Sequence, residues 1–240
     1  MNRRYFITGT DTGVGKTVVT AALMVAWQAR GIRCAPVKPV QTGGITGDDD
    51  LAWCLTFAEP AITGAERAAL VMHRYALPVS PHLAAREAGE RLSVQSLETR
   101  IAELSNHWNI LIIEGAGGLL VPLNETETMA DLITATRAVP ILVTRDTLGT
   151  LNHTALTLQE LKRRGLTPAA VVINQSTPPR DAIDRRIRED NVVEITRLAG
   201  KVPVVAWPYQ SEINRTILVT AGASLAKAVE QGDGTGCPQE

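Results

Sequence analysis

The sequence predicts one α/β domain built on a parallel β-sheet, with helices on both faces of the sheet. Short apolar runs alternate with longer segments in which apolar residues recur three and four positions apart. This alternation is typical of a chain of βαβ units. The strand-like runs are apolar on both faces, as in parallel sheets that helices cover on both sides. A length of 240 residues suits a single domain of this kind.

The predicted strands are the short runs with the fewest polar residues, and NILIIEG at 109–115 is the most apolar of them. Strands are expected at 4–9, 33–40, 109–115, 140–145, 169–174 and 201–207. Helical periodicity occurs near 16–31, 49–57, 82–89, 94–105, 128–137, 151–164, 181–199 and 221–230. The domain is therefore expected to cover 1–230. Residues 231–240 have no apolar periodicity and are expected to form a disordered tail.

Composition excludes several classes of function. The 24 lysines and arginines nearly balance the 25 acidic residues, so the chain lacks the basic surface expected of a nucleic-acid or lipid-surface binder. No apolar run approaches the roughly 20 residues that cross a bilayer. The first ten residues lead into a strand without a signal-peptide core, and the three cysteines have no C-x-x-C spacing. We expect a cytoplasmic protein with reduced thiols.

The segment GTDTGVGKT, residues 9–17, connects the first predicted strand to a predicted helix. Backbone N–H groups of such a turn point at bound phosphate, and the dipole of the following helix favours negative charge. The usual spacing of a phosphate-binding loop is G-x-x-x-x-G-K-[ST]. Here Gly9 lies one position too early, and Thr10 holds the first-glycine position. Strand, glycines, Lys-Thr and helix together predict a P-loop NTPase-like fold and a nucleotide site.

The residue types of this loop suit a nucleoside triphosphate and its metal ion. Glycines let the backbone approach the phosphates closely, and Lys16 is expected to reach the β- and γ-phosphates. The hydroxyl of Thr17 is expected to hold Mg²⁺. The residues predicted to bind nucleotide here are Gly13, Val14, Gly15, Lys16, Thr17 and Val18.

The same loop resembles that of the dethiobiotin synthetases, whose members carry a G-T-x-T-x-V-G-K-T pattern. Its fixed positions are matched by Gly9, Thr10, Thr12, Val14, Gly15, Lys16 and Thr17. The unusual spacing is thus a feature of that variant. A second signature of the family is similar to EGAGG at 114–118, and the resemblance extends from about residue 4 to residue 230.

The segment VKPVQTG, residues 37–43, follows the second predicted strand, whose end should face the phosphate loop. A solvated lysine at a strand end is the ordinary interpretation of Lys38. However, K-P-V resembles a family motif, which implies that Lys38 is catalytic together with Lys16 and that Thr42 lies beside the substrate. An ammonium group near the γ-phosphate stabilises the charge that develops during phosphoryl transfer.

Acidic residues at two places are candidate Mg²⁺ ligands. Asp48, Asp49 and Asp50 precede a predicted helix, and such residues are usually solvated or cap the helix. The resemblance implies that one of them contacts Mg²⁺; Asp50 is preferred because Leu51 follows it directly, and Asp49 is the alternative.

Glu114 ends the most apolar strand, where a buried carboxylate needs a positive partner. Nucleotide-bound Mg²⁺ suits that role, and a lysine or arginine is the alternative. The resemblance also implies that Gly115, Ala116 and Gly117 adjoin the nucleotide.

Two further segments resemble substrate-binding parts of the family. LGTLNHTALT, residues 148–157, opens a helix that Thr150 or Asn152 could cap, and an exposed helix start is also an anion receptor. The resemblance implies that Asn152 receives the substrate carboxylate across a homodimer interface. SPH at 80–82 either lies beside the aliphatic chain of the substrate or starts a helix with Pro81 in its first position.

The residues predicted to surround the nucleotide base come from two strand ends. Asn174 can pair a donor and an acceptor with a base edge, although asparagine equally serves ordinary turns. Gln175 replaces a commonly acidic neighbour, so the nucleotide preference stays open. The family positions around the base correspond to Asn174, Gln175, Pro208, Tyr209 and Gln210.

The resemblance implies an ATP- and Mg²⁺-dependent ligase that converts 7,8-diaminononanoate and CO₂ to dethiobiotin, the penultimate step of biotin synthesis. A carbamate of the substrate attacks the γ-phosphate, and the second amine then closes the ring. One alternative is an ATP-driven switch like the chromosome- and septum-partitioning ATPases, which carry lysine in K-G-G-x-G-K-T where this chain has Asp11. Another is an amide-forming P-loop ligase such as the cobyrinate diamide synthetases, which need an amidotransferase module.

Overall fold

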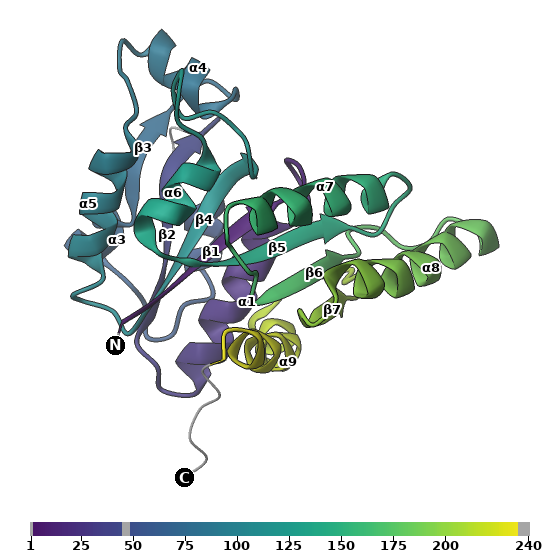
Figure 1. Ribbon diagram of the computed structural model, residues 1–240. Helices are drawn as coiled ribbons and strands as arrows, with labels where there is room; N and C mark the ends of the chain where they lie inside the picture. Colours follow the sequence, from purple (N-terminus) through teal and green to yellow (C-terminus); the bar gives the residue numbers. More distant parts are fainter. Residues whose placement is uncertain (1, 45–48, 235–240) are drawn as a thin grey trace.

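The computed structural model describes residues 2–44 and 49–234. Within these residues one seven-stranded sheet has the order β3-β2-β4-β1-β5-β6-β7, and all of its strand pairs are parallel (Figure 1). The strands are β1 (Arg3–Gly9), β2 (Cys34–Thr42), β3 (Val71–Tyr75), β4 (Ile110–Gly118), β5 (Val139–Arg145), β6 (Ala170–Asn174) and β7 (Val204–Trp207). The helices are α1 (Lys16–Ala29), α2 (Asp50–Leu55), α3 (Gly64–Ala69), α4 (Pro81–Glu87), α5 (Val94–Leu104), α6 (Met129–Thr136), α7 (Thr150–Arg163), α8 (Ala182–Ala199) and α9 (Arg215–Gly232).

The helices pack in groups on the sheet. Helix α1 packs against α2 and α9, whereas α5 packs against α6, and α7 against α8. In Figure 1, α6 and α7 lie in front of the sheet and α1 passes behind it. The central strands are apolar throughout because both of their faces are covered; Tyr5, Phe6 and Ile7 of β1 are fully buried. Tyr5 also stacks on Trp27 of α1, with 5.1 Å between ring centroids. The predicted fold class is confirmed.

The direction of the chain connections reverses between β4 and β1. From β1 the chain crosses β4 to reach β2, whereas from β4 it crosses β1 to reach β5. In open parallel sheets, ligands bind outside the carboxyl ends of the strands at such a reversal. Gly9 ends β1, whereas β4 continues past Glu114 to Gly118, so Glu114 lies inside its strand and not at the predicted end. Glu114 is paired with Ile7, two residues before Gly9, so the fold still places the phosphate loop beside the predicted acid.

Two elements were not predicted, and both lack an apolar pattern. Strand β3 lies at the sheet edge, where His73 and Arg74 interrupt the apolar residues and stay partly exposed. Helix α3 buries none of its residues, so no apolar face marks it in the sequence. Short edge elements of this kind are held by tertiary contacts rather than by local preference.

Some boundaries also differ from the prediction. Strand β2 continues to Thr42, so Lys38 lies inside a strand rather than at its end. Helix α9 starts at Arg215, because the side chain of Asn214 accepts a hydrogen bond from the Ile217 N–H (3.1 Å). The same helix reaches Gly232, inside the predicted tail of 231–240, and residues 235–240 of that tail lie outside the described residues.

None of the helices in the described part of the chain combines the length and hydropathy of a membrane span.

Candidate active site

The phosphate loop owes its shape to glycine. Gly13 and Gly15 have φ values of 69° and 101°, in the left-handed region that favours glycine. A Cβ on Gly15 would also lie 2.1 Å from the side-chain nitrogen of Asn174. Gly15 is the N-cap of α1, and no side chain caps that helix start. An uncapped helix start of this kind leaves backbone N–H groups for an anion.

Lys16 lies folded into this loop. Its side chain is buried, and its ammonium group donates a hydrogen bond to the carbonyl of Asp11 (3.0 Å). Burial lowers the pKa of Lys16 to about 8, and the nearby Lys38 ammonium acts in the same direction. A bound triphosphate would provide the anionic partner that this ammonium lacks.

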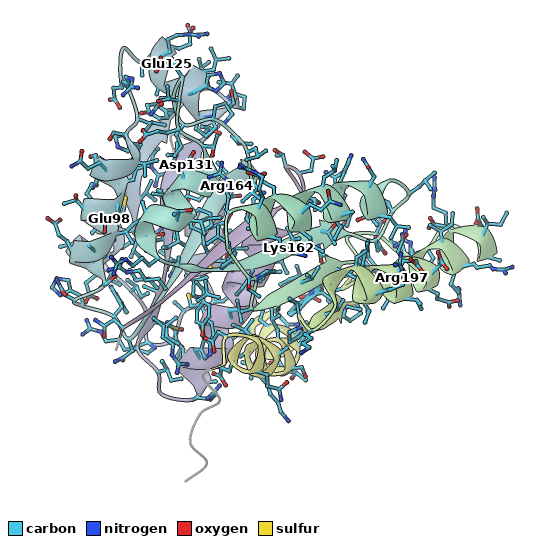
Figure 2. All side chains as sticks on the ribbon, viewed as in Figure 1. Glu98, Glu125, Asp131, Lys162, Arg164 and Arg197 are labelled. Atoms are coloured by element: carbon cyan, nitrogen blue, oxygen red, sulfur yellow. The ribbon has the colours of Figure 1, made fainter. Side chains whose placement is uncertain are left out.

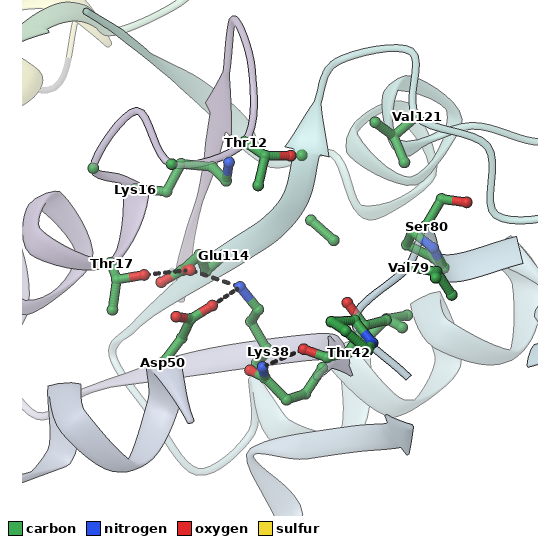
Figure 3. A pocket seen from close by; sticks show the side chains of 18 residues that line it. Thr12, Lys16, Thr17, Lys38, Thr42, Asp50, Val79, Ser80, Glu114 and Val121 are labelled. Carbon is green, nitrogen blue, oxygen red and sulfur yellow. Dashed lines mark hydrogen bonds and ion pairs between the residues drawn. The ribbon is translucent and has the colours of Figure 1, made fainter. Parts of the chain in front are cut away.

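Lys38 joins two carboxylates beneath the loop. Its ammonium lies 2.6 Å from Glu114 Oε1 and 2.8 Å from Asp50 Oδ2. The hydroxyl of Thr17 donates to the same Glu114 oxygen at 2.9 Å. Figure 3 shows these four side chains, from four different elements, pointing toward one another. The sheet reversal thus brings together all residues predicted to serve the metal and one of the two predicted catalytic lysines.

The charges in this cluster stabilise one another. Burial acts to lower the pKa of Lys38, but the Glu114 and Asp50 carboxylates outweigh it and raise that pKa. Burial likewise acts to raise the pKa of Asp50, but the ammonium of Lys38 outweighs it and lowers that pKa. Lys38 is therefore charged, and the interpretation of Lys38 as a solvated lysine does not apply to a side chain that is only 4% exposed.

The acidic run divides into residues with different contacts. Asp49 is the N-cap of α2 and accepts a hydrogen bond from the Ala52 N–H (2.7 Å). It also forms an ion pair with Arg74 of β3. Asp50 instead faces Lys38 and lines the cavity, whereas Asp48 lies outside the described residues. Of the two described candidates, only Asp50 faces the cluster of Lys38 and Glu114, where the metal is predicted.

The donor set fits Mg²⁺. Thr17, Asp50 and Glu114 offer a hydroxyl and two carboxylates, which are the hard oxygen donors that Mg²⁺ prefers. They already surround a cationic group, the ammonium of Lys38. Within residues 2–44 and 49–234, no three or more His, Cys, Asp or Glu side chains gather as a self-sufficient metal site. One or two protein carboxylates, completed by phosphate and water oxygens, are the usual arrangement for nucleotide-bound Mg²⁺.

A cavity of about 600 Å³ opens from this cluster. The phosphate loop forms one wall, and the segment 78–81 forms the opposite wall (Figure 3). Thr42 lies between the two walls, and Ala116 and Gly117 line the cavity on the β4 side. Gly115 does not line it; a Cβ there would lie 2.8 Å from the ring of Phe6, so this glycine serves packing.

The residues predicted to surround the nucleotide base lie behind the phosphate loop, at the ends of β6 and β7. The side chain of Asn174 is buried and donates to the carbonyl of Val14 (2.9 Å). Gln175 donates its N–H to the carbonyl of Trp207 (2.9 Å), which places residues 208–210 beside it. None of these residues lines the cavity. The ends of β6 and β7 thus bring the five predicted residues together.

Asn152 lies away from the cavity, exposed on α7. The expectation that Thr150 or Asn152 caps this helix is wrong, because the N-cap is Gly149, with φ 91° and no side-chain cap. Thr150 instead turns inward and donates to the carbonyl of Arg145 (2.7 Å). Residues 80–82 start a helix, as one of the two interpretations of SPH predicted. Ser80 is the N-cap of α4, and Pro81 is its first helical residue. Both residues nevertheless line the cavity.

The model of a family described as AAA domain matches residues 3–216. The ATP-dependent dethiobiotin synthetase BioD of Anaeromyxobacter dehalogenans (strain 2CP-C) is 38% identical over 94% of this chain and 98% of its own length. The protein of the same name from Mycobacterium avium (strain 104) is 47% identical over 70% of this chain and 72% of its own. The chain belongs to the AAA domain family and to its ATP-dependent dethiobiotin synthetases. The predicted family is confirmed.

Solved structures with little sequence identity share the fold of this dethiobiotin synthetase family member. The MinC:MinD cell division protein complex of Aquifex aeolicus matches with a TM-score of 0.58 and 12% identity, over 99% of this chain and 98% of that chain. A ParA family ATPase from Chlorobium tepidum TLS matches with a TM-score of 0.55 and 13% identity, over 96% and 97%. At such identities the likeness concerns the fold alone.

Several cavity residues of this dethiobiotin synthetase family member were not predicted as site residues. They include Val40, Gln41, Pro78, Val79 and Val121. Their residue types are ordinary for strands and turns, so no local signal distinguishes them. Gln41 is the most polar of these residues; its side-chain oxygen is buried without a hydrogen-bond partner in the described part of the chain.

Proposed function

We propose that this chain is an ATP- and Mg²⁺-dependent ligase that forms the cyclic urea dethiobiotin from 7,8-diaminononanoate and CO₂. The family relationship supports the reaction, and one structural observation supports the assignment of residues. Lys38 is buried between Glu114 and Asp50, directly beneath the phosphate loop and at the start of a cavity that continues to Thr42. A triphosphate on one wall would thus face a second substrate on the other.

The reaction proceeds by three changes of bonding. An amine of the substrate adds to CO₂, forming an N–C bond and losing a proton. The carbamate oxygen then attacks the γ-phosphorus, and the bond to the leaving ADP oxygen breaks. The second amine attacks the carbamate carbon and loses a proton, and the C–O bond to phosphate breaks, which closes the ring and releases phosphate. No covalent bond to the protein is needed, so positioning and neutralisation of charge provide the catalysis.

The residues of the site suit these tasks. The N–H groups of the loop and the ammonium of Lys16 would bind the phosphates, and Lys38 would neutralise charge where the carbamate oxygen meets phosphorus. Thr17, Asp50 and Glu114 would hold Mg²⁺, which when bound neutralises the oxygens of the transferred phosphate. Asn174, Gln175 and residues 208–210 would border the base.

We extend the proposal to a homodimer in the cytoplasm. Asn152 is exposed and remote from the cavity of its own chain, as expected of a residue that serves a site on a second copy. Two leucines near it, Leu148 and Leu156, are 86% and 58% exposed. Apolar side chains exposed on this scale are typical of an interface. Sedimentation of the wild-type protein and of Leu156→Glu tests this extension, with a shift from dimer to monomer expected.

The reaction is tested with purified protein, ATP, Mg²⁺ and bicarbonate, with and without the diamine. We expect phosphate release that depends on the diamine, together with dethiobiotin detected by mass spectrometry. Lys38→Met should lose product formation while nucleotide binding persists. Phosphate release at the same rate with and without the diamine would instead favour an ATP-driven switch. The partitioning ATPases are switches of this class, and this chain shares their fold.

A further inference from the structure

Helix α8 carries a buried arginine that is not among the predicted site residues. Arg188 is only 4% exposed, and its guanidinium makes a set of contacts with loop carbonyls and carboxylates. It donates to Asp146 Oδ2 (2.7 Å), Asp184 Oδ2 (2.9 Å), the carbonyl and hydroxyl of Thr177 (2.7 and 3.3 Å) and the carbonyl of Pro178 (3.3 Å). Arg188 therefore joins α8 to the loop after β5 and to the loop after β6.

Asn191, one helical turn later, makes a second connection. Its side-chain N–H₂ donates to the carbonyl of Asp146 (2.7 Å). Asp184, four residues before Arg188, anchors the start of α8 by accepting the Arg180 N–H (3.0 Å). Asp184, Arg188 and Asn191 form what we call the α8 clamp.

Both clamped loops are continuous with residues that touch the phosphate loop. The loop after β6 begins beyond Asn174, whose side chain donates to the carbonyl of Val14 (2.9 Å). The loop after β5 begins beyond Arg145, whose guanidinium donates to the carbonyl of Thr12. The α8 clamp therefore acts on the phosphate loop from behind, through the ends of two strands.

Apolar packing around the loops after β5 and β6 is limited, so the α8 clamp provides much of what holds these loops in place. Leu142, Val171, Ile173 and Ile195 form a small cluster separate from the main core. In addition, Asp146 Oδ1 is buried without a hydrogen-bond partner among the described residues. Buried charges with incomplete hydrogen bonding are costly, and apolar residues of similar size would often be more stable. The buried charges of the α8 clamp are explained if their role is to fix the geometry of the two loops.

We propose that Arg188 is a positioning residue for the nucleotide, acting through the loops at 146–147 and 175–178. By holding Thr177 and Pro178, which follow Gln175, together with Asp146 of the neighbouring loop, it sets the shape of the base-side corner and the affinity for nucleotide. This inference rests on the nucleotide site of the proposed function and not on its diamine chemistry.

The test variant is Arg188→Lys. A lysine keeps one positive charge between Asp146 and Asp184, but it cannot also reach the carbonyls of Thr177 and Pro178, because it lacks the guanidinium fork. We expect the Kd for ADP, measured by calorimetry, to rise between about tenfold and a hundredfold, as misplaced binding groups typically cause. The kcat/KM ratios among ATP, CTP and GTP should also move toward one another, while the KM for the diamine stays unchanged.

A matched control lies on the same helix. Arg197 pairs with Glu194 on the exposed surface of α8 (Figure 2), and Arg197→Lys should leave ADP binding and base preference as in the wild type. If Arg188→Lys fails to fold, Asn191→Leu replaces it, since this variant removes the hydrogen bond to the Asp146 carbonyl and leaves every charge in place.

The outcomes separate this inference from the proposed function. Folded variants with wild-type ADP affinity and base preference would overturn it. An equal loss of affinity for all nucleotides, with a large fall in Tm, would show a purely structural role and would overturn it as well. A wild-type protein that binds ADP but forms no dethiobiotin would contradict the proposed function alone; weakened ADP binding by the variant would then still support a positioning role for Arg188.

Discussion

The ammonium of Lys38 lies 2.6 Å from a carboxylate oxygen of Glu114, and both side chains are buried. The sequence left two partners open for Glu114, a divalent cation or a basic side chain. The structure contains the basic side chain, and it also supplies Asp50 and Thr17 as neighbours suited to the cation. With no metal bound, Lys38 thus provides the positive partner that this buried carboxylate needs.

Glu114→Gln should raise the Mg²⁺ requirement by about tenfold or more, because an amide binds a hard cation more weakly than a carboxylate does. A titration of phosphate release with Mg²⁺ measures the half-saturating concentration. Calorimetric titration of Mg²⁺ into the ADP-bound protein gives a readout that is independent of turnover. Glu98→Gln on the surface of α5 is the control (Figure 2), and coincident titrations for Glu114→Gln and wild type would contradict the assignment.

Lys16→Ala should reduce nucleotide-dependent turnover by at least about a hundredfold, because it removes the charge expected at the β- and γ-phosphates. The variant should keep its fold, since in this structure the Lys16 ammonium makes one hydrogen bond, to the Asp11 carbonyl. Phosphate release measures the turnover of the variant, and circular dichroism checks its fold. Lys162→Ala, on the exposed side of α7, is the matched control (Figure 2). Unchanged turnover by Lys16→Ala would remove the loop from the mechanism.

Asp131→Asn should reduce the free energy of unfolding by about 1 kcal/mol at pH 7, the usual value of a hydrogen bond at a helix start. Asp131 accepts hydrogen bonds from the Thr128 hydroxyl (2.6 Å), from Arg164 (2.7 Å) and from the Thr128 N–H (2.7 Å) (Figure 2). Burial acts to raise the pKa of Asp131, but these bonds outweigh it, so that pKa falls below 3.8.

The pH dependence follows from that direction. A carboxylate whose pKa is lower in the folded than in the unfolded state stabilises the protein at pH values above the unfolded pKa. That stabilisation is lost as the pH falls through the folded pKa. The difference between wild type and Asp131→Asn should thus be constant from pH 7 to about pH 4 and shrink below that. Urea unfolding at several pH values measures it, with Asp190→Asn as an exposed control. A difference that persists unchanged in acid would contradict the role of the charge.

Gly222→Ala should destabilise the protein by about 1–3 kcal/mol, as overpacking of a tight interface does. A Cβ at Gly222 of α9 would lie 2.4 Å from the carbonyl oxygen of Ala22 in α1. The two helices would have to separate, although alanine is the better helix former by about 1 kcal/mol. Ser224→Ala, exposed on the same helix, should change stability little. Equal urea midpoints for Gly222→Ala and wild type would show that the interface has room.

Local motifs predicted which residues would come together at the centre of the candidate site. The loop at 9–17, Lys38 and Glu114 could be placed together because the carboxyl ends of parallel strands share one sheet edge. The choice between Asp49 and Asp50 could not be made in this way, since it depends on Arg74 of β3, a strand that the sequence pattern does not reveal.

Other features depend on contacts between distant segments. Thr150 has the residue type of a helix cap, yet it turns inward to the Arg145 carbonyl because Gly149 already ends the loop. Arg188 lies in a run of alternating charges that is typical of a solvated helix face, and only the packing of two loops against it shows that it is buried. Such roles follow from tertiary structure and have no local sequence signal.

The packing of α9 on α1 has a consequence for biosynthesis. Trp27 of α1 donates its ring N–H to Glu230 of α9 (3.0 Å), and Tyr5 of β1 hydrogen-bonds Asp233. During translation, the helix that begins at the phosphate loop is made first, and the helix that covers it follows only after β7. Until α9 is made, the nascent chain exposes an apolar surface of α1, and exposed surface of this kind is prone to aggregation.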